Sequence, residues 1–251
     1  MRRDIRVIED GTRLDDIYND KERYVQQMFS SIANRYDLNN TILSAGLHHY
    51  WKRFAVDKAS LREGDRVIDI CSGTADIAIL AAKRVGEKGH VIALDMNREM
   101  LSIGIGKIHG EGLRENIAPF IGNAERLNFQ DNSFDAALVG FGIRNVNEID
   151  RAFREIRRVL KPGGRGVCLE FSRATSFILR KIYSVYSFKV LPWIGTWVSR
   201  DRTGVYKYLP DSIKRFPSQD ELKTIMIEAG FSKVEYFNLT NGIVAVHIGV
   251  K

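Results

Sequence analysis

A buried strand followed by a turn of small residues constrains most strongly how this chain can fold. The run 67–70, apolar except for Asp69, leads into the turn 71–76 (Cys-Ser-Gly-Thr-Ala-Asp), and the next apolar run, 91–94, ends at Asp95. From Gly73 at position 73 to Asp95 at position 95 is 22 residues, close to the roughly 20 over which a second parallel strand brings a carboxylate to ribose hydroxyls. The pattern predicts a nucleoside-binding half of a doubly wound sheet. The alternative is a strand–turn–helix joint whose small residues only allow close packing.

The turn also discriminates between nucleoside ligands. Dinucleotide sites use several glycines so that backbone amides can approach a pyrophosphate, whereas this turn holds only Gly73. Asp69 and Asp76 flank it and would repel a phosphate. S-adenosylmethionine carries a ribose, an adenine, an ammonium and a sulfonium but no phosphate, so the turn favours it over NAD.

Composition predicts one α/β domain in a reducing compartment. The chain has 251 residues, 44% of them hydrophobic and 27% charged, as in ordinary globular proteins. It contains no run of about 18 apolar residues, and its start lacks the apolar stretch of a secretory signal. Cys71 and Cys168 both lie in predicted strands, without the spacing of a disulfide framework or metal site. We therefore expect a cytoplasmic protein with no metal.

The apolar patterning alternates between strands and helices. The predicted strands are 66–71, 90–95, 118–121, 134–139 and 166–171, followed by a hairpin of 233–239 and 243–250; the predicted helices are 76–84, 97–109, 148–160 and 219–229. Residues 1–60 form a helical cap, with Tyr24, Met28, Ile32 and Tyr36 at helical spacing and a second helix through Trp51. Residues 61–251 then form a Rossmann-like, seven-stranded, mostly parallel sheet with an antiparallel C-terminal hairpin.

Ligands of such sheets bind over the carboxyl ends of the strands. The residues predicted to bind the cofactor therefore lie in or just after the carboxyl ends of four successive strands: Asp69, Gly73 and Thr74; Asp95 and Met96; Asn123 and Ala124; and Gly140. Asp95 is expected to accept from two ribose hydroxyls, and Asn123 to contact the adenine edge. Asp95 could instead only stabilise the following helix dipole, and Asn123 could be only a turn residue.

The net charge of +7 is concentrated in one segment, 173–215. It holds nine Lys and Arg residues against two Asp residues, interleaved with eight aromatic residues. This composition is typical of segments that bind a nucleic acid or an anionic membrane surface. We predict a basic aromatic lid that docks on lipid, the alternative being a solvated basic face with ordinary core aromatics.

The sequence resembles the ubiquinone/menaquinone biosynthesis C-methyltransferases of the UbiE type. The resemblance lies in FSSIANRYDLNN, GLHHYWKR, FGIRNV, RVLKPGG, LEFS and YSFKVLPWIG, of which FGIRNV and YSFKVLPWIG are the most specific. It implies a class I methyltransferase fold and methyl transfer from S-adenosylmethionine to a ring carbon of a polyprenylated quinol, a precursor of menaquinone or ubiquinone. Cofactor contacts are then implied at Thr74, Asp95, Asn123, Ala124 and Gly140.

Two positions depart from the family pattern. Ala75 stands where the family has a second glycine, and it is expected to narrow the backbone approach slightly. Gly140 stands where the family has a serine, so any contact there must come from the backbone.

The implied reaction requires alignment and deprotonation rather than a covalent nucleophile. Arg144 is the predicted electrostatic stabiliser of a phenolate, with Asn145 beside it. His48, His49 and Asp37 of the cap are candidate bases, of which His48 is retained as a catalytic candidate. Tyr183 and Tyr186 are candidates for the quinol pocket.

The expected partners are a prenylated quinol and the inner face of a membrane, with a homodimer or a quinone-biosynthesis complex as further options. An RNA, DNA or other small-molecule methyltransferase is an alternative, but the chain lacks an Asn/Asp-Pro-Pro-Tyr element, which disfavours a nucleic-acid substrate. A non-catalytic module that binds S-adenosylmethionine is the other alternative.

Overall fold

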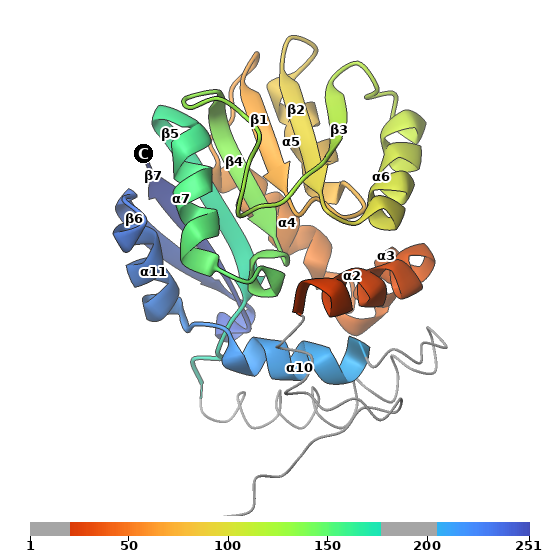
Figure 1. Cartoon of the computed structure of the whole chain (residues 1–251), viewed down its shortest axis with the longest axis vertical. Coiled ribbons are helices and arrows are strands. Elements are labelled where there is room, and N and C mark those ends of the chain that lie inside the picture. Colours follow the sequence, from red (N-terminus) through yellow and green to blue (C-terminus); the bar gives the residue numbers. More distant parts are fainter. Residues whose placement is uncertain (1–20, 177–204) are drawn as a thin grey trace, which may run out of the picture.

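A twisted seven-stranded sheet organises the molecule (Figure 1). The computed structural model describes residues 21–176 and 205–251, and the strand order within them is β3-β2-β1-β4-β5-β7-β6. The strands are β1 (Arg66–Ile70), β2 (His90–Asp95), β3 (Ile117–Ile121), β4 (Phe134–Gly140), β5 (Leu160–Phe171), β6 (Ser232–Leu239) and β7 (Val244–Val250). Neighbours among β1–β5 pair in parallel, and β7 is antiparallel to both β5 and β6. The predicted sheet with its C-terminal hairpin is confirmed.

Helices cover both faces of the sheet. One face packs against α4 (Leu47–Lys58), α5 (Asp76–Val85) and α6 (Arg98–Gly110), and the other against α7 (Ile149–Val159) and α11 (Gln219–Glu228). Successive residues of β1 alternate between these two cores, with Val67 in the first and Ile68 in the second. Strands that are buried on both sides read as continuous apolar runs, which explains the pattern of 67–70.

The cap lies at the carboxyl edge of the parallel strands (Figure 1). It consists of α2 (Lys21–Ile32), a 3₁₀ turn η1 (Ala33–Arg35), α3 (Tyr36–Leu43) and α4, with α10 (Val205–Arg215) alongside. The helical spacing from Tyr24 to Tyr36 therefore extends over two helices, α2 and α3, which η1 separates. Tyr208 of α10 packs into the cap core with Val25, Met28 and Ile32. No helix in the described ranges has the length and apolar character needed to cross a bilayer.

Two predicted boundaries differ from the structure. The helix α7 ends at Val159, but the following strand starts at Leu160 instead of 166. Its pairing with β4 jumps from Phe134↔Leu160 to Ala136↔Arg165, so the Lys-Pro-Gly-Gly stretch forms a bulge and not only a helix terminator. Cys71 lies just after β1, not inside it, with a left-handed φ of 55°.

Most of the predicted lid, 173–215, lies outside the described residues, Tyr183 and Tyr186 included. Its described C-terminal part is α10, which runs beneath the cap (Figure 1).

Candidate functional site

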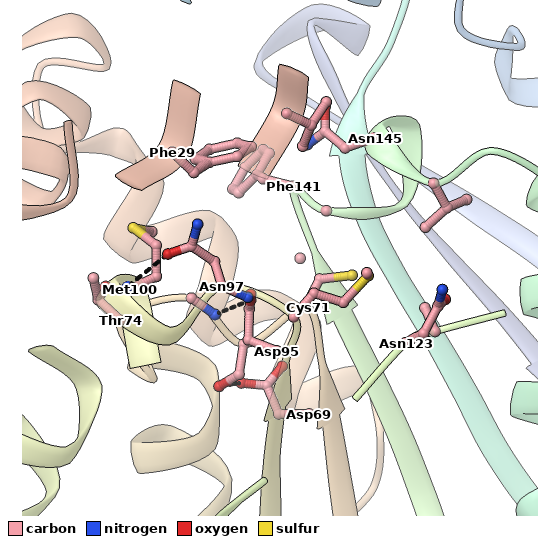
Figure 2. Close-up of a pocket in the computed structure, with 18 of the residues that line it drawn as sticks. Phe29, Asp69, Cys71, Thr74, Asp95, Asn97, Met100, Asn123, Phe141 and Asn145 are labelled. Atoms are coloured by element: carbon pink, nitrogen blue, oxygen red, sulfur yellow. Dashed lines mark hydrogen bonds between the residues drawn. The ribbon is translucent and has the colours of Figure 1, made fainter. Parts of the chain in front are cut away.

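A polar pocket opens where the carboxyl ends of β1, β2 and β4 meet the cap (Figure 2). The empty space of this strand-end pocket, together with the open solvent at its mouth, is about 970 Å³. Every residue that the sequence nominated for cofactor binding lines it: Asp69, Gly73, Thr74, Asp95, Met96, Asn123, Ala124 and Gly140. The cap closes the other side with Val25, Gln26, Phe29 and Tyr36, which sequence spacing could not place because they precede the sheet.

Asp95 holds the first two turns together. Its Oδ2 accepts from the backbone N–H of Gly73 at 2.7 Å, and its Oδ1 accepts from that of Asn97 at 2.7 Å. Burial raises the pKa of this carboxyl above its usual value. Each carboxylate oxygen has a second lone pair, so the group can still accept from ribose hydroxyls.

Asp69 is the most deeply buried acid of the pocket, with 1% of its surface exposed. Its Oδ2 accepts from the Ser72 hydroxyl at 2.7 Å and from the Ala78 N–H at 2.9 Å, whereas its buried Oδ1 has no partner among the described residues. Burial raises its pKa to about 7. A positively charged ligand group would satisfy this carboxylate.

Asn123 has the turn role that was its alternative interpretation, since its Oδ1 accepts from the Glu125 N–H at 2.7 Å. It lines the pocket as well (Figure 2). The two roles are compatible because an amide has donors besides this acceptor.

The two departures from the family pattern have local explanations. A Cβ on Gly140 would lie 2.3 Å from Ile77 Cδ1, so this position can offer only backbone as long as Ile77 keeps its place. Ala75 has a left-handed φ of 64°, is fully buried and packs towards Gly104. Ala75 is absent from the pocket wall, so its methyl group does not narrow the approach as expected.

A second, apolar pocket adjoins the first and shares Phe29, Tyr36 and Phe141 with it. Its empty space, together with the open solvent at its mouth, is about 1150 Å³. Its other described lining residues are Met28, Ile32, Asn39, Asn40, Leu43, Ser44, Leu47, Trp51, Arg144, Phe171, Tyr208, Leu209, Thr240 and Ile243. These come from the cap, α10, the loop after β4, the end of β5 and the connection between β6 and β7. Sequence analysis missed this pocket, because its walls are ordinary apolar residues from distant segments.

The 3₁₀ turn η2 (Ile143–Asn145) lies between the two pockets. Asn145 lines the strand-end pocket, whereas its neighbour Arg144 lines the apolar pocket. Arg144 Nη1 donates to Glu170 Oε1 at 2.8 Å and to the Phe141 carbonyl at 2.7 Å. Asn145 Oδ1 accepts from the Tyr208 hydroxyl at 3.1 Å. The pair predicted as catalytic is thus held rigidly where the pockets meet.

A model of the ubiE/COQ5 methyltransferase family matches residues 17–251. The chain belongs to this family. It is 46% identical to the ubiquinone/menaquinone biosynthesis C-methyltransferase UbiE of Methylococcus capsulatus, over 93% of this chain and 94% of that one. The UbiE of Hahella chejuensis is 45% identical over 92% and 93% of the two chains.

Solved structures share the fold at low identity. A methyltransferase from Thermotoga maritima, described as a possible histamine N-methyltransferase, has a TM-score of 0.63 and 24% identity, covering 90% of this chain and 99% of that one. An S-adenosylmethionine-dependent methyltransferase from Aquifex aeolicus has a TM-score of 0.59 and 20% identity, covering 79% and 88%. The ubiE/COQ5 chain therefore has the class I methyltransferase fold, and it is an enzyme, as predicted.

The strand-end pocket of this ubiE/COQ5 methyltransferase fits S-adenosylmethionine. The unpartnered Asp69 Oδ1 is a buried acceptor suited to a cation, and Asp95 suits a ribose. The turn after β1 also contains a single glycine, Gly73, whereas a pyrophosphate site uses several glycine amides. The predicted cofactor is thus the one that both the family and the residues support.

None of the candidate bases of the cap, His48, His49 and Asp37, lines either pocket. His48 is buried but lines neither pocket; its Nε2 lies 3.1 Å from Thr41 Oγ1, and burial lowers its pKa to about 4. Asp37 accepts from the Thr74 hydroxyl at 2.7 Å and pairs with Lys107 at 2.8 Å. Asp37 therefore ties the cap to the cofactor turn. His49 is exposed.

Proposed function

We propose that the chain transfers the methyl group of S-adenosylmethionine to a ring carbon of a prenylated quinol, in the biosynthesis of menaquinone, ubiquinone or both. The observation that carries the proposal is the meeting of a polar and an apolar pocket at Phe29, Tyr36 and Phe141, with Arg144 and Asn145 between them. The polar pocket suits the donor and the apolar pocket suits a lipid ring. The quinone-biosynthesis names of the relatives point the same way.

The apolar pocket favours a neutral lipid over a nucleic acid. Among its described lining residues, Arg144 is the only charged one, whereas a nucleic-acid site would present several cations to the phosphates.

The residues of the chain have separable tasks in this reaction. When bound, S-adenosylmethionine supplies an electrophilic methyl group. Asp69 and Asp95 hold its charged and ribose parts, and Arg144 stabilises the phenolate that makes the quinol ring nucleophilic. Holding the two reactants in line can lower the barrier by about 7–11 kcal/mol in favourable cases.

The test is methyl transfer from labelled S-adenosylmethionine to demethylmenaquinol and to a methoxybenzoquinol, each with a short prenyl tail. We expect labelled product from at least one quinol under reducing conditions and none from the oxidised quinones. Binding of the donor without turnover on either quinol would contradict the proposal and favour a non-catalytic role.

Cofactor affinity is expected to depend on the ionisation of Asp69. Its pKa is raised to about 7 in the free protein, and a bound cation favours the carboxylate and lowers this pKa, so binding releases a proton. The affinity for S-adenosylhomocysteine should therefore rise with pH up to about 7 and level off above it. Isothermal titration between pH 5.5 and 8.5 measures this affinity, and the affinity of the Asp69→Asn variant should not change with pH in this range. If the variant keeps the pH dependence of the wild type, another group causes it.

We also propose that the cap docks on a membrane surface. Four exposed apolar side chains lie on the two cap helices that wall the apolar pocket: Leu38 and Ile42 of α3, and Leu47 and Tyr50 of α4. Together with the basic segment 173–215, they would let a lipid tail enter from the bilayer. A homodimer or a larger complex stays a prediction.

Vesicle flotation tests this docking. We expect the protein to float with vesicles containing anionic lipid, and the Leu38→Ser/Ile42→Ser variant to float about tenfold less, because two exposed apolar contacts are lost. Ile227→Ser, an exposed apolar residue of α11, is the matched control and should float as the wild type does. Equal flotation of all three proteins would contradict a role for α3.

A further inference from the structure

Asn39 is a buried amide without a hydrogen-bond partner in the described part of the chain. It lies in α3, only 3% exposed, and lines the apolar pocket. Neither its Oδ1 nor its Nδ2 has a partner among residues 21–176 and 205–251, an unusual state for a buried side chain. A leucine of similar size would give the free protein a higher free energy of unfolding, because leaving both a donor and an acceptor unpaired in the interior is destabilising. The position is therefore suited to a polar ligand rather than to stability.

The neighbouring polar groups of the pocket are largely engaged elsewhere. The Ser44 hydroxyl donates to the Asn40 carbonyl at 2.6 Å, and the Thr240 hydroxyl accepts from Trp51 Nε1 at 2.8 Å. Arg144 lines the same pocket, and its buried Nε has no partner among the residues that the structure describes. Asn39 and Arg144 thus both line the pocket and carry polar atoms that are unpaired among the described residues.

These two residues differ in what they can recognise. A guanidinium only donates hydrogen bonds, so Arg144 binds a quinone carbonyl and a quinol hydroxyl alike. An amide both donates and accepts. A hydroxyl can accept from Asn39 Nδ2 and donate to Oδ1, whereas a carbonyl can only accept and leaves Oδ1 buried and unpaired.

We propose that Asn39 binds a ring oxygen of the substrate and selects its reduced, hydroxyl-bearing form. The inference rests on the proposed function and deepens it: the reduced ring is the form that can attack the methyl group of the donor, and Asn39 disfavours binding of the inert quinone. Asn39 is thus a specificity-determining residue.

Binding to the two redox forms tests this selection. The probe is a naphthoquinone with a single prenyl unit, titrated anaerobically into the full chain saturated with S-adenosylhomocysteine, once oxidised and once reduced with dithionite. We expect the wild type to bind the quinol about tenfold more tightly, since only the quinol pairs the buried acceptor Oδ1, and pairing such an acceptor is worth roughly 5- to 150-fold in affinity. Asn39→Leu should bring the ratio close to one.

A stability measurement separates recognition from a structural role. Asn39→Leu removes two unpaired polar atoms, so its thermal midpoint without ligand should rise by roughly 2–4 °C. Asn39→Met serves as a second variant, with the same expected loss of selectivity. Met28→Leu reshapes the same wall without a polar change, so its quinol-to-quinone ratio should stay near that of the wild type.

The possible failures are distinguishable. Equal wild-type affinity for the two forms, or a preference retained in both Asn39 variants, would overturn the role of Asn39 and leave the proposed function standing. A fall of the thermal midpoint in both variants would show Asn39 to be structural and would likewise overturn its role. A wild type that binds neither form would overturn the proposed function together with this inference.

Discussion

Replacing Arg144 with leucine is expected to lower kcat/KM for the quinol by roughly 10²- to 10³-fold, the effect of removing one preorganised charge partner from a developing oxyanion. The same change should lower the free energy of unfolding by about 3–5 kcal/mol, because it leaves Glu170 buried without its partner. Glu170 is 2% exposed, and burial already raises its pKa in the presence of the guanidinium. Steady-state kinetics and chemical denaturation measure the two effects.

The double variant Arg144→Leu/Glu170→Leu separates the two effects. Removing both charges removes the unpaired acid, and replacing a buried ion pair by apolar residues is often neutral or stabilising. We therefore expect the double variant to regain most of its stability but none of its activity. A double variant with near wild-type kcat/KM would show that Arg144 acts only through folding.

The cofactor half of the site could be predicted from the sequence because its residues lie at strand ends, which the local apolar pattern marks. Asp95 ends a strand, Gly73 and Asn123 each come just after one, and parallel pairing brings the carboxyl ends of the strands to one edge. Asn97 belongs to a residue type that is favoured at helix N-caps, and its side chain accepts from the Met100 N–H at 2.9 Å.

The substrate half could not be predicted in this way. Its walls bring together α3, α4 and α10, and packing between helices distant in sequence leaves no spacing signal. His48 shows the limit of reasoning from residue type, because the α4 helix that carries it directs it away from both pockets. Asn39 carried no signal at all, since a buried asparagine is informative only once its missing partners are known.

The bulge at the start of β5 was missed for a related reason. Proline and two glycines after α7 correctly predicted the end of the helix. The same residues can also form an irregular strand when an adjacent strand supplies hydrogen-bond partners. Here β4 is that adjacent strand. Local propensity could not reveal this tertiary pairing.

The second large effect is expected at Gly142, where two loops of the strand-end pocket meet. A Cβ at this position would lie 2.3 Å from Cys71 Cβ and 3.1 Å from its Sγ. Neither backbone can easily retreat, because Ile70 and Val139, just before these loops, are paired in the sheet. Gly142→Ala should therefore lower the free energy of unfolding by about 3 kcal/mol and weaken the binding of S-adenosylhomocysteine.

Cys71 supplies a direct compensation for this clash. Cys71→Gly removes both close atoms and suits the left-handed φ of 55°, which costs a residue with a side chain about 1–2 kcal/mol. We expect Cys71→Gly/Gly142→Ala to regain most of the stability and the affinity. Cys71→Ala is the matched control: it removes the sulfur but keeps the Cβ, so Cys71→Ala/Gly142→Ala should stay as defective as Gly142→Ala alone. Denaturation and titration of these proteins measure this, and rescue by the alanine pair would show that the sulfur, not the Cβ, prevents the approach.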